Sequence, residues 1–200
     1  MADMERLGRN LKARGFTLHC VDTASEAAEY LLSQIQETTV GVGGSKTFEA
    51  LNVYNALREN NNVYWHWKHG NSPEVFRAAA QAEVYISSVN AISETGELVN
   101  VDGRGNRVAA LTFGEGKRIF LVASTKKLCP DLSSAIERAR KTAAPINVQK
   151  LPGKRPCTAT GSCVDCRSPD RGCCTLQVMM FKPMGAQSVD LILIDEDLGY

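Results

Sequence analysis

The sequence predicts an α/β fold in which a mainly parallel sheet is covered by helices on both faces. Helical and strand patterns alternate along most of the chain, which is typical of strands joined by helical crossovers. Most of the strand patterns are short apolar runs, as expected for strands buried on both faces. The chain has 200 residues, 44% hydrophobic and 22% charged, which suits one globular domain spanning residues 1–200.

The first half of the chain supplies most of this alternation. Met4, Leu7 and Leu11 recur at helical spacing, and Thr23 with Glu26 forms a capping box before the next helix. The expected elements are a helix at 2–14, a strand at 16–21, a helix from 23 to about 35, a strand ending at 42, a helix at 47–59, a strand at 62–67, a helix at 73–81 and a strand at 84–89.

The pattern changes after Gly96. Two short apolar runs, Leu98–Val101 and Arg107–Phe113, flank the turn dipeptide Asp102-Gly103, which predicts a β-hairpin. The remaining expected elements are a strand at 118–123, a helix at 130–141, a Cys-rich loop at 152–174 and two strands at 176–181 and 189–194.

Charge and hydropathy exclude several classes of protein. The formal net charge of +1 argues against a dedicated nucleic-acid binder. No apolar run approaches the roughly 18–20 residues that span a bilayer, and the start, MADMERLGRNLKARGF, lacks the apolar core of a secretory signal. We therefore expect a cytoplasmic protein with no membrane span and no nucleic-acid partner. In a reducing cytosol, clustered cysteines bind metal or carry out redox chemistry more often than they form disulfides.

The Cys-rich loop is the most specific chemical signal. Five of the seven cysteines lie in the run PCTATGSCVDCRSPDRGCC. Thiolates are soft ligands, so an iron–sulfur cluster is the first interpretation. The candidate ligands are Cys157, Cys163, Cys166 and one of Cys173 and Cys174, with Cys173 preferred. Structural zinc on the same sulfurs, a redox disulfide such as one between Cys163 and Cys166, and free thiols remain open alternatives.

A glycine-rich turn, Val40–Thr47, joins a predicted strand to a predicted helix. Gly43 and Gly44 would let a ligand approach the backbone, while Ser45, Lys46 and Thr47 add hydroxyl donors and a charge. It is not a Walker A loop, because a serine stands where glycine should precede the lysine, and it is not a clean dinucleotide fingerprint. It is either a tight strand–helix turn or a pocket for a phosphate, carboxylate or CoA-like group.

A polar block, SSVNAISETGELVNVDGRGNRVAA, follows a predicted strand at residues 87–110. Polar side chains that leave strands at this edge point into the same crevice as the glycine turn, although asparagine and glycine also build ordinary turns. Three of these residues, Asn90, Glu94 and Asp102, are candidates for catalysis, and Glu97 is an alternative base. The pocket candidates are Asn90, Glu94, Asn100, Asp102, Asn106 and Arg107.

Four segments together resemble the lactate-utilisation (LUD) domain family: VGVGGSKT, the polar block, AAPINVQKL and PCTATGSCVDC. The resemblance extends from about residue 25 to the C-terminus. It implies a fold similar to the superfamily of ribose-5-phosphate isomerase, glucosamine-6-phosphate deaminase and CoA transferases, whose members hold phosphorylated sugars or CoA esters at matching loops. It also implies a role beside iron–sulfur proteins in bacterial lactate oxidation. Two-domain members carry a ferredoxin-like module that this single-domain chain lacks.

Two functions follow as expectations. The first is an accessory redox component of organic-acid oxidation, with an iron–sulfur or other Cys-ligated centre and a pocket for a small anion. The second is a small-molecule enzyme or sensor of the isomerase/CoA-transferase type, with zinc or disulfides bracing the Cys-rich loop. The expected partners are an organic acid, sugar phosphate or CoA-like ligand, iron–sulfur electron-transfer proteins and, by analogy alone, a second copy of the chain.

Overall fold

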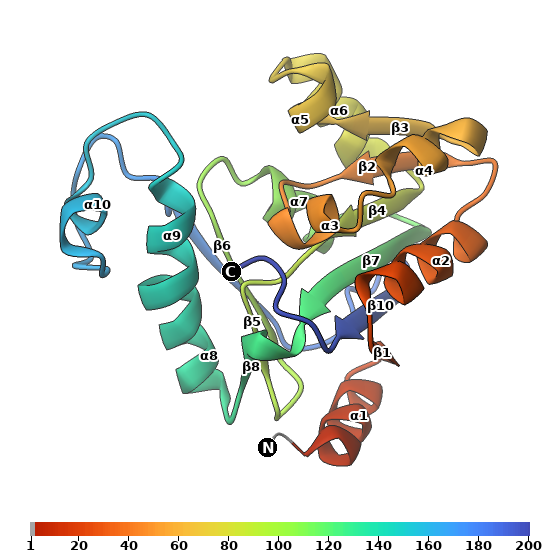
Figure 1. Cartoon of the computed structure of the whole chain (residues 1–200), viewed down its shortest axis with the longest axis horizontal. Coiled ribbons are helices and arrows are strands. Elements are labelled where there is room, and N and C mark those ends of the chain that lie inside the picture. The colour runs from red at the N-terminus through yellow and green to blue at the C-terminus, as the bar shows by residue number, and fades with distance from the viewer. Residues whose placement is uncertain (1–2) are drawn as a thin grey trace.

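The computed structural model describes residues 3–200 and is built around a parallel sheet. Across these residues, six strands form the sheet in the order β1-β10-β7-β4-β2-β3, and every neighbouring pair runs parallel (Figure 1). The strands are β1 (Thr17–Val21), β2 (Thr39–Val42), β3 (Asn62–Trp65), β4 (Val84–Ser87), β7 (Lys117–Ser124) and β10 (Ala186–Ile194). The prediction of a parallel α/β sheet is confirmed.

Helices connect and cover these strands and also form part of the structure beside the main sheet. They are α1 (Met4–Ala13), α2 (Ala24–Gln34), α3 (Lys46–Ala50), α4 (Tyr54–Asn60), α5 (His66–His69), α6 (Pro73–Gln81), α7 (Asn106–Thr112), α8 (Leu132–Arg138), α9 (Ala144–Val148) and α10 (Pro156–Thr160). A short 3-10 turn, Thr125–Lys127, follows β7, and a π-helical turn, Ala139–Ala143, joins α8 to α9.

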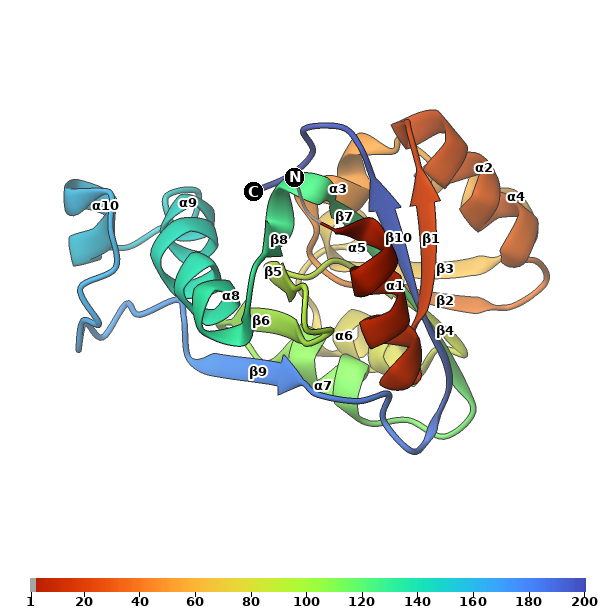
Figure 2. The same cartoon turned by 90° about the horizontal axis from the view of Figure 1, so that it is seen from below.

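The two faces of the sheet carry separate hydrophobic cores. Ile119 and Leu121 of β7 pack with residues of α1 and α7 on one face. The alternate residues Phe120 and Val122 pack with residues of α2, α3 and α4 on the other. Successive side chains of a strand point to opposite faces, so β7 contributes to both cores. Helices therefore cover both faces, as predicted (Figure 2).

A smaller mixed sheet lies beside the main one. Its order is β8-β5-β6-β9, and β6 runs antiparallel to both β5 and β9. Its strands are β5 (Ala91–Ser93), β6 (Leu98–Asp102), β8 (Leu128–Cys129) and β9 (Thr175–Met179). The buried residues Ala91, Val99, Cys129, Ala135 and Ala139 form a third core between this sheet and α8. This sheet brings the polar block and the end of the Cys-rich loop together.

The predicted hairpin of Leu98–Val101 with Arg107–Phe113 is wrong. The second run forms helix α7, and β6 pairs with β5 and β9 instead. Gly105 has φ 86°, a left-handed conformation that turns the chain into the helix. The Asp102 carboxylate then accepts hydrogen bonds from the backbone N–H groups of Arg107 (3.0 Å) and Val108 (3.3 Å). These hydrogen bonds from the first turn of α7 to a buried carboxylate favour a helix. The apolar pattern of Arg107–Phe113 alone fits a helix and a strand equally well.

Two other predicted elements end earlier than expected. The helix at 47–59 is divided into α3 and α4 because Asn52 takes a left-handed conformation with φ 51°. The strand at 62–67 stops at Trp65, and the next four residues form the short helix α5. The Cys-rich segment 152–174 is mostly irregular, as predicted, but includes the short helix α10.

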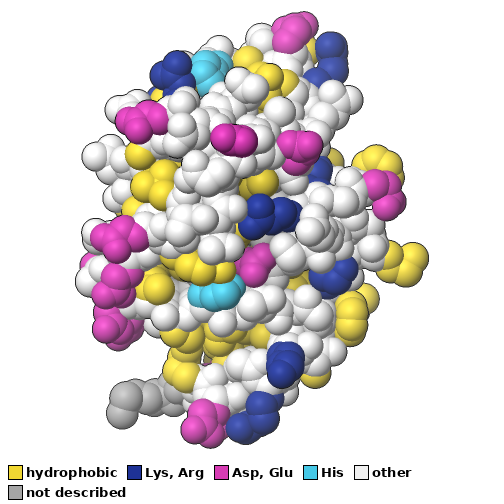
Figure 3. All heavy atoms as spheres, turned by 90° about the vertical axis from the view of Figure 1, so that its right-hand side faces the viewer, with side chains coloured by type: hydrophobic (Ala, Val, Ile, Leu, Met, Phe, Trp, Pro, Cys, Tyr) yellow, Lys and Arg dark blue, Asp and Glu magenta, His cyan; other side chains and the backbone are white. Residues whose placement is uncertain are grey.

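The surface is mixed in charge. The face in Figure 3 carries acidic and basic side chains side by side, in keeping with a formal net charge of +1. None of the helices between residues 3 and 200 combines the length and apolar character that crossing a membrane requires.

Candidate functional site

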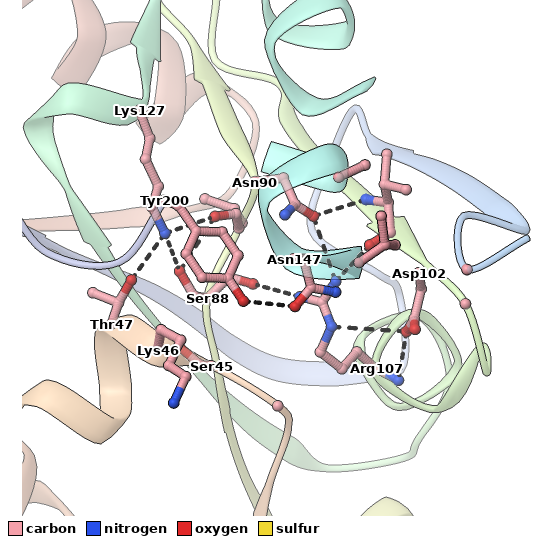
Figure 4. Close-up of a pocket in the computed structure, with 17 residues that line it drawn as sticks. Ser45, Lys46, Thr47, Ser88, Asn90, Asp102, Arg107, Lys127, Asn147 and Tyr200 are labelled. Atoms are coloured by element: carbon pink, nitrogen blue, oxygen red, sulfur yellow. Dashed lines mark hydrogen bonds and ion pairs between the residues drawn. The ribbon is translucent and has the colours of Figure 1, made fainter. Parts of the chain in front are cut away.

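A polar pocket lies at the carboxyl ends of β2, β4 and β7. Parallel strands end at the same edge of a sheet, and ligands of open α/β folds bind there. Here β6 and α9 close the other side of the pocket. The lining residues are Gly44, Ser45, Lys46, Thr47, Ser88, Val89, Asn90, Val101, Asp102, Gly103, Arg107, Lys127, Ala144, Asn147, Val148, Gly172 and Tyr200 (Figure 4).

Lys127 is the charged lining residue that sequence reasoning missed, and Asn147 and Tyr200 were missed as well. Its side chain leaves the turn after β7 and is almost fully buried, with a residue exposure of 2%. The Nζ group donates to Thr47 Oγ1 (2.9 Å), Ser88 Oγ (2.8 Å) and the Val89 carbonyl (3.1 Å). One feature of the sequence could have identified Lys127: it follows the carboxyl end of a long apolar strand, and pockets of α/β folds form at that edge of the sheet.

The charge of Lys127 is destabilised by its surroundings. Burial, together with the nearby cations Arg138, Arg107 and Lys126, lowers the pKa of the Lys127 amine to about 7. The two hydroxyls that contact Nζ can accept from an ammonium or donate to a neutral amine. The hydrogen-bond network therefore accommodates both protonation states.

Arg107 occupies the opposite side of Ser88 (Figure 4). Its guanidinium donates to the Val101 carbonyl (2.7 Å) and to Asn90 Oδ1 and the Ser88 carbonyl (both 3.4 Å). Its Nε lies 3.8 Å from the Asp102 carboxylate. That carboxylate is closer to the backbone at the start of α7, as described above. The guanidinium therefore donates its hydrogen bonds to neutral oxygens and pairs with Asp102 at the longer distance of 3.8 Å.

The glycine turn shapes the pocket rather than supplying most of its charge. A Cβ on Gly43 would lie 2.8 Å from Ser87 Oγ and 3.1 Å from Arg107 Cγ, so only glycine fits behind the pocket. Ser45 caps α3 by accepting from Phe48 N–H (3.0 Å). Lys46 at the rim pairs with Glu49 (2.5 Å).

The last residues of the chain cover part of the pocket. The Tyr200 hydroxyl donates to Asn147 Oδ1 (2.6 Å) and joins the C-terminal segment to α9. Burial raises the pKa of Tyr200, so the phenol stays neutral near pH 7. A Cβ on Gly199 would overlap the Thr47 hydroxyl, so this segment passes directly over the glycine turn.

Most of the sequence candidates meet in this pocket. Those that line it are Gly44, Ser45, Lys46, Thr47, Asn90, Asp102 and Arg107, and Gly43 packs directly behind them.

Three candidates lie elsewhere. Asn100 is buried between strands and donates to Gln177 Oε1 (3.1 Å). Glu94 lines a separate surface cavity next to α1, and Asn106 begins α7 without lining the pocket. The alternative base Glu97 binds Arg14.

The lining charges favour an anion. Three cationic side chains, Lys46, Arg107 and Lys127, line the pocket, whereas Asp102 supplies the one carboxylate among its described lining residues. Only Arg107 of the three cations lies near that carboxylate. An excess of basic over acidic side chains in a partly enclosed space attracts anionic ligands.

The Cys-rich loop forms a second cavity. Its lining includes Cys157, Cys163, Cys166 and Cys173, together with Arg140, Arg155 and Arg171. Cys174 is exposed and lies outside this lining. Arg171 orders the loop by donating to the carbonyls of Cys166 (2.7 Å) and Cys173 (2.9 Å).

All the cysteines of the loop are free thiols in this structure. Burial raises the pKa of the Cys173 thiol, and Cys163 and Cys166 add to that effect, whereas Arg171 opposes it. Within residues 3–200, no three His, Cys, Asp or Glu side chains are arranged to hold a metal. The thiols thus have the donor chemistry of a metal site but not, in this conformation, its geometry.

The two cavities share a wall. Ala144, Val148 and Gly172 line both of them. A Cβ on Gly103 in the pocket would lie 2.6 Å from the Gly172 carbonyl, so the two backbones touch. Cys174 N–H donates to the Asp102 carbonyl (2.8 Å), which fixes the end of the loop to the pocket.

Comparisons with known proteins agree on the family and the fold. The model of the LUD domain family matches residues 4–194. The crystal structure of a DUF162 family protein from Deinococcus radiodurans is similar, with a TM-score of 0.55 and 10% identity, covering 96% of this chain and 95% of that chain. At this identity the likeness shows the fold alone. No curated protein matches the chain.

Proposed function

The chain belongs to the LUD domain family, which is associated with lactate utilisation, and we propose that it is an accessory redox component of organic-acid oxidation that binds a small carboxylate in the pocket of Arg107 and Lys127. The observation that carries this proposal is the pair of basic side chains, Arg107 and Lys127, on either side of Ser88, which share a single lining carboxylate side chain, that of Asp102, 3.8 Å from Arg107. A guanidinium presents a planar fork that matches a carboxylate. Tyr200 and Asn147 narrow the pocket and favour a ligand of a few carbon atoms.

The redox part of the proposal concerns the Cys-rich loop. Four thiols and three arginines around one cavity provide soft ligands and positive charge for an iron–sulfur cluster, or the same thiols for zinc. Because the thiols do not form a ligand group in the described conformation, binding requires the loop to close. When bound, an iron–sulfur cluster would supply one-electron transfer; Cys157, Cys163, Cys166 and Cys173 would hold it.

Substitution of Arg107 tests the pocket. We expect Arg107→Met to abolish measurable lactate binding. Arg107→Lys keeps the charge but loses the planar fork, so it should weaken binding by about tenfold or more, because a charge-assisted hydrogen bond contributes about 1.5–3 kcal/mol. Calorimetric titration with lactate measures the affinity, and circular dichroism confirms folding. Arg9→Met is the matched control, because Arg9 is an exposed arginine of α1 that pairs with Glu5 and does not line the pocket.

Unchanged lactate affinity in folded Arg107→Met would contradict the proposed pocket. A stabilising shift with ribose 5-phosphate or a CoA ester, and none with lactate, would favour instead an enzyme or sensor of the isomerase/CoA-transferase type.

Metal analysis tests the Cys-rich loop. Protein purified without oxygen should be brown, absorb visible light and contain iron, and the Cys163→Ser/Cys166→Ser variant should lose both colour and iron. Cys20→Ser is the control, since Cys20 is an exposed cysteine of β1 outside the loop. Colourless protein that contains stoichiometric zinc would contradict the iron–sulfur cluster and indicate a structural zinc site instead. Protein free of both metals would remove the metal-based part of the proposal.

A further inference from the structure

Lys127 has chemistry that anion binding alone does not use. A buried lysine is ordinarily paired with a carboxylate. In the part of the chain that the structure describes, the hydrogen-bond acceptors of Lys127 Nζ are two hydroxyls and a carbonyl, and the charged groups that act on it are cations. Such surroundings favour a neutral amine, which is a nucleophile.

Lys117 provides an internal comparison at the other end of β7. It is also buried, with 4% exposure, and burial lowers its pKa. Its Nζ donates to the carbonyls of Ala80 (2.6 Å), Phe113 (3.2 Å) and Ala110 (3.4 Å). Carbonyls only accept hydrogen bonds and so hold an ammonium. Lys127 differs because Thr47 and Ser88 can donate to its lone pair, and because it lines a pocket.

The position of Arg107 indicates the ligand class. Lys127 Nζ contacts the Ser88 hydroxyl, and Arg107 contacts the carbonyl of the same residue. The amine and the guanidinium therefore lie on either side of Ser88, close enough for one small ligand to contact both. A carboxylate held by Arg107 would place the adjacent carbon of the ligand beside Lys127. A carbonyl on that adjacent carbon defines a 2-oxo acid.

We propose that Lys127 condenses with the carbonyl of a small 2-oxo acid whose carboxylate is bound by Arg107. The inference rests on the proposed carboxylate pocket and adds a covalent step to it. The lone pair of Nζ forms a bond to the carbonyl carbon, and the carbonyl oxygen takes up a proton to give a carbinolamine. Loss of that oxygen as water leaves a carbon–nitrogen double bond, and the carbon keeps its oxidation level. Thr47 and Ser88, which already contact Nζ, relay the protons.

Reductive trapping tests the inference on the full-length protein. Incubation with pyruvate and cyanoborohydride reduces the imine to a stable secondary amine, which peptide mass spectrometry locates. With a pKa of about 7, on the order of half of Lys127 is neutral at pH 7, against roughly one in three thousand of an ordinary lysine, so Lys127 should be labelled at least about tenfold more than Lys117 or Lys46. Lactate, which has a hydroxyl where pyruvate has its ketone, should compete with labelling and give no adduct itself.

Variants locate the adduct and separate the two proposals. Lys127→Arg should lose the adduct, and Arg107→Lys should reduce labelling by about tenfold. Even labelling of all lysines, or no adduct on Lys127 in protein that binds lactate, would overturn the imine and leave the carboxylate pocket intact. Protein that binds neither lactate nor pyruvate would remove the pocket as well. Labelling of wild-type protein needs no substitution, so the test holds even if a variant fails to fold.

Discussion

Replacement of Lys127 by methionine is expected to change the dependence of stability on pH. The native amine has a pKa of about 7, below the 10.5 of an unperturbed lysine. Below pH 7 Lys127 is protonated in both states, and burial of the charged amine lowers the stability of the native state by its full amount. Between pH 7 and 10.5 the unfolded lysine keeps a proton that the native lysine has lost, so the stability of the native state rises with pH over this range. Over the full interval the free energy of unfolding should rise by on the order of 5 kcal/mol through Lys127.

Urea unfolding of wild type and Lys127→Met from about pH 7 to about pH 10 measures this effect, because contributions common to both proteins cancel. Wild type should gain stability relative to the variant as pH rises, by several kcal/mol in all. The exposed Lys12, replaced by methionine, controls for the loss of one positive charge. A difference between wild type and Lys127→Met that stays constant over this range would show that the native lysine keeps its proton.

Gly41→Ala should have the largest effect on folding itself. Gly41 lies in β2 where α6 crosses the sheet, and an added Cβ would overlap the Ala79 carbonyl oxygen and lie 2.7 Å from the carbonyl carbon. These are backbone atoms, so no change of rotamer relieves the overlap and α6 must move away from the sheet. Overpacking typically costs about 1–3 kcal/mol, and we expect about 3 kcal/mol or more here because the obstacle is backbone.

Gly8→Ala is the matched control, because it is the same substitution in an open place. Its added Cβ would meet Leu18 at 3.8 Å, an ordinary contact, in the middle of α1. Alanine in place of glycine in a helix should add about 0.5–1 kcal/mol of stability. Urea unfolding of both variants measures the contrast. Equal stabilities would mean that α6 approaches β2 less closely than the structure shows.

The sequence predicts the main sheet well because each parallel strand is a local apolar run bounded by polar residues. It fails at α7, where Asp102 and Gly105 determine the direction of the chain and the apolar run of Arg107–Phe113 fits helix and strand alike. The smaller sheet is predicted only in part: strands are expected at 98–101 and 176–181, where β6 and β9 lie, but β5, β8 and the strand pairing are missed. Its strands are short, and β9 pairs with β6, a strand distant in the sequence.

The candidate site is predicted in part. The glycine turn, Asn90, Asp102 and Arg107 carry local signals and meet in the pocket. Lys127 has only its place beyond the end of a strand as a local signal, because its burial depends on Thr47 and Ser88, which are 80 and 39 residues away in the sequence. Asn100 and Glu94 look equivalent to Asn90 in a polar block, and only the pairing of β5 and β6 decides which of them faces the pocket.

The wall of Ala144, Val148 and Gly172 would couple the proposed anion pocket to the proposed metal site of the Cys-rich loop. Any closure of the loop that displaces Gly172 changes the space beside Gly103, because their backbones are already in contact. Thermodynamic reciprocity then links the two sites. The factor by which metal binding with loop closure changes the affinity for the acid equals the factor by which the acid changes the affinity of the loop for metal. Occupancy of the pocket would in this way set the readiness of the thiols to react.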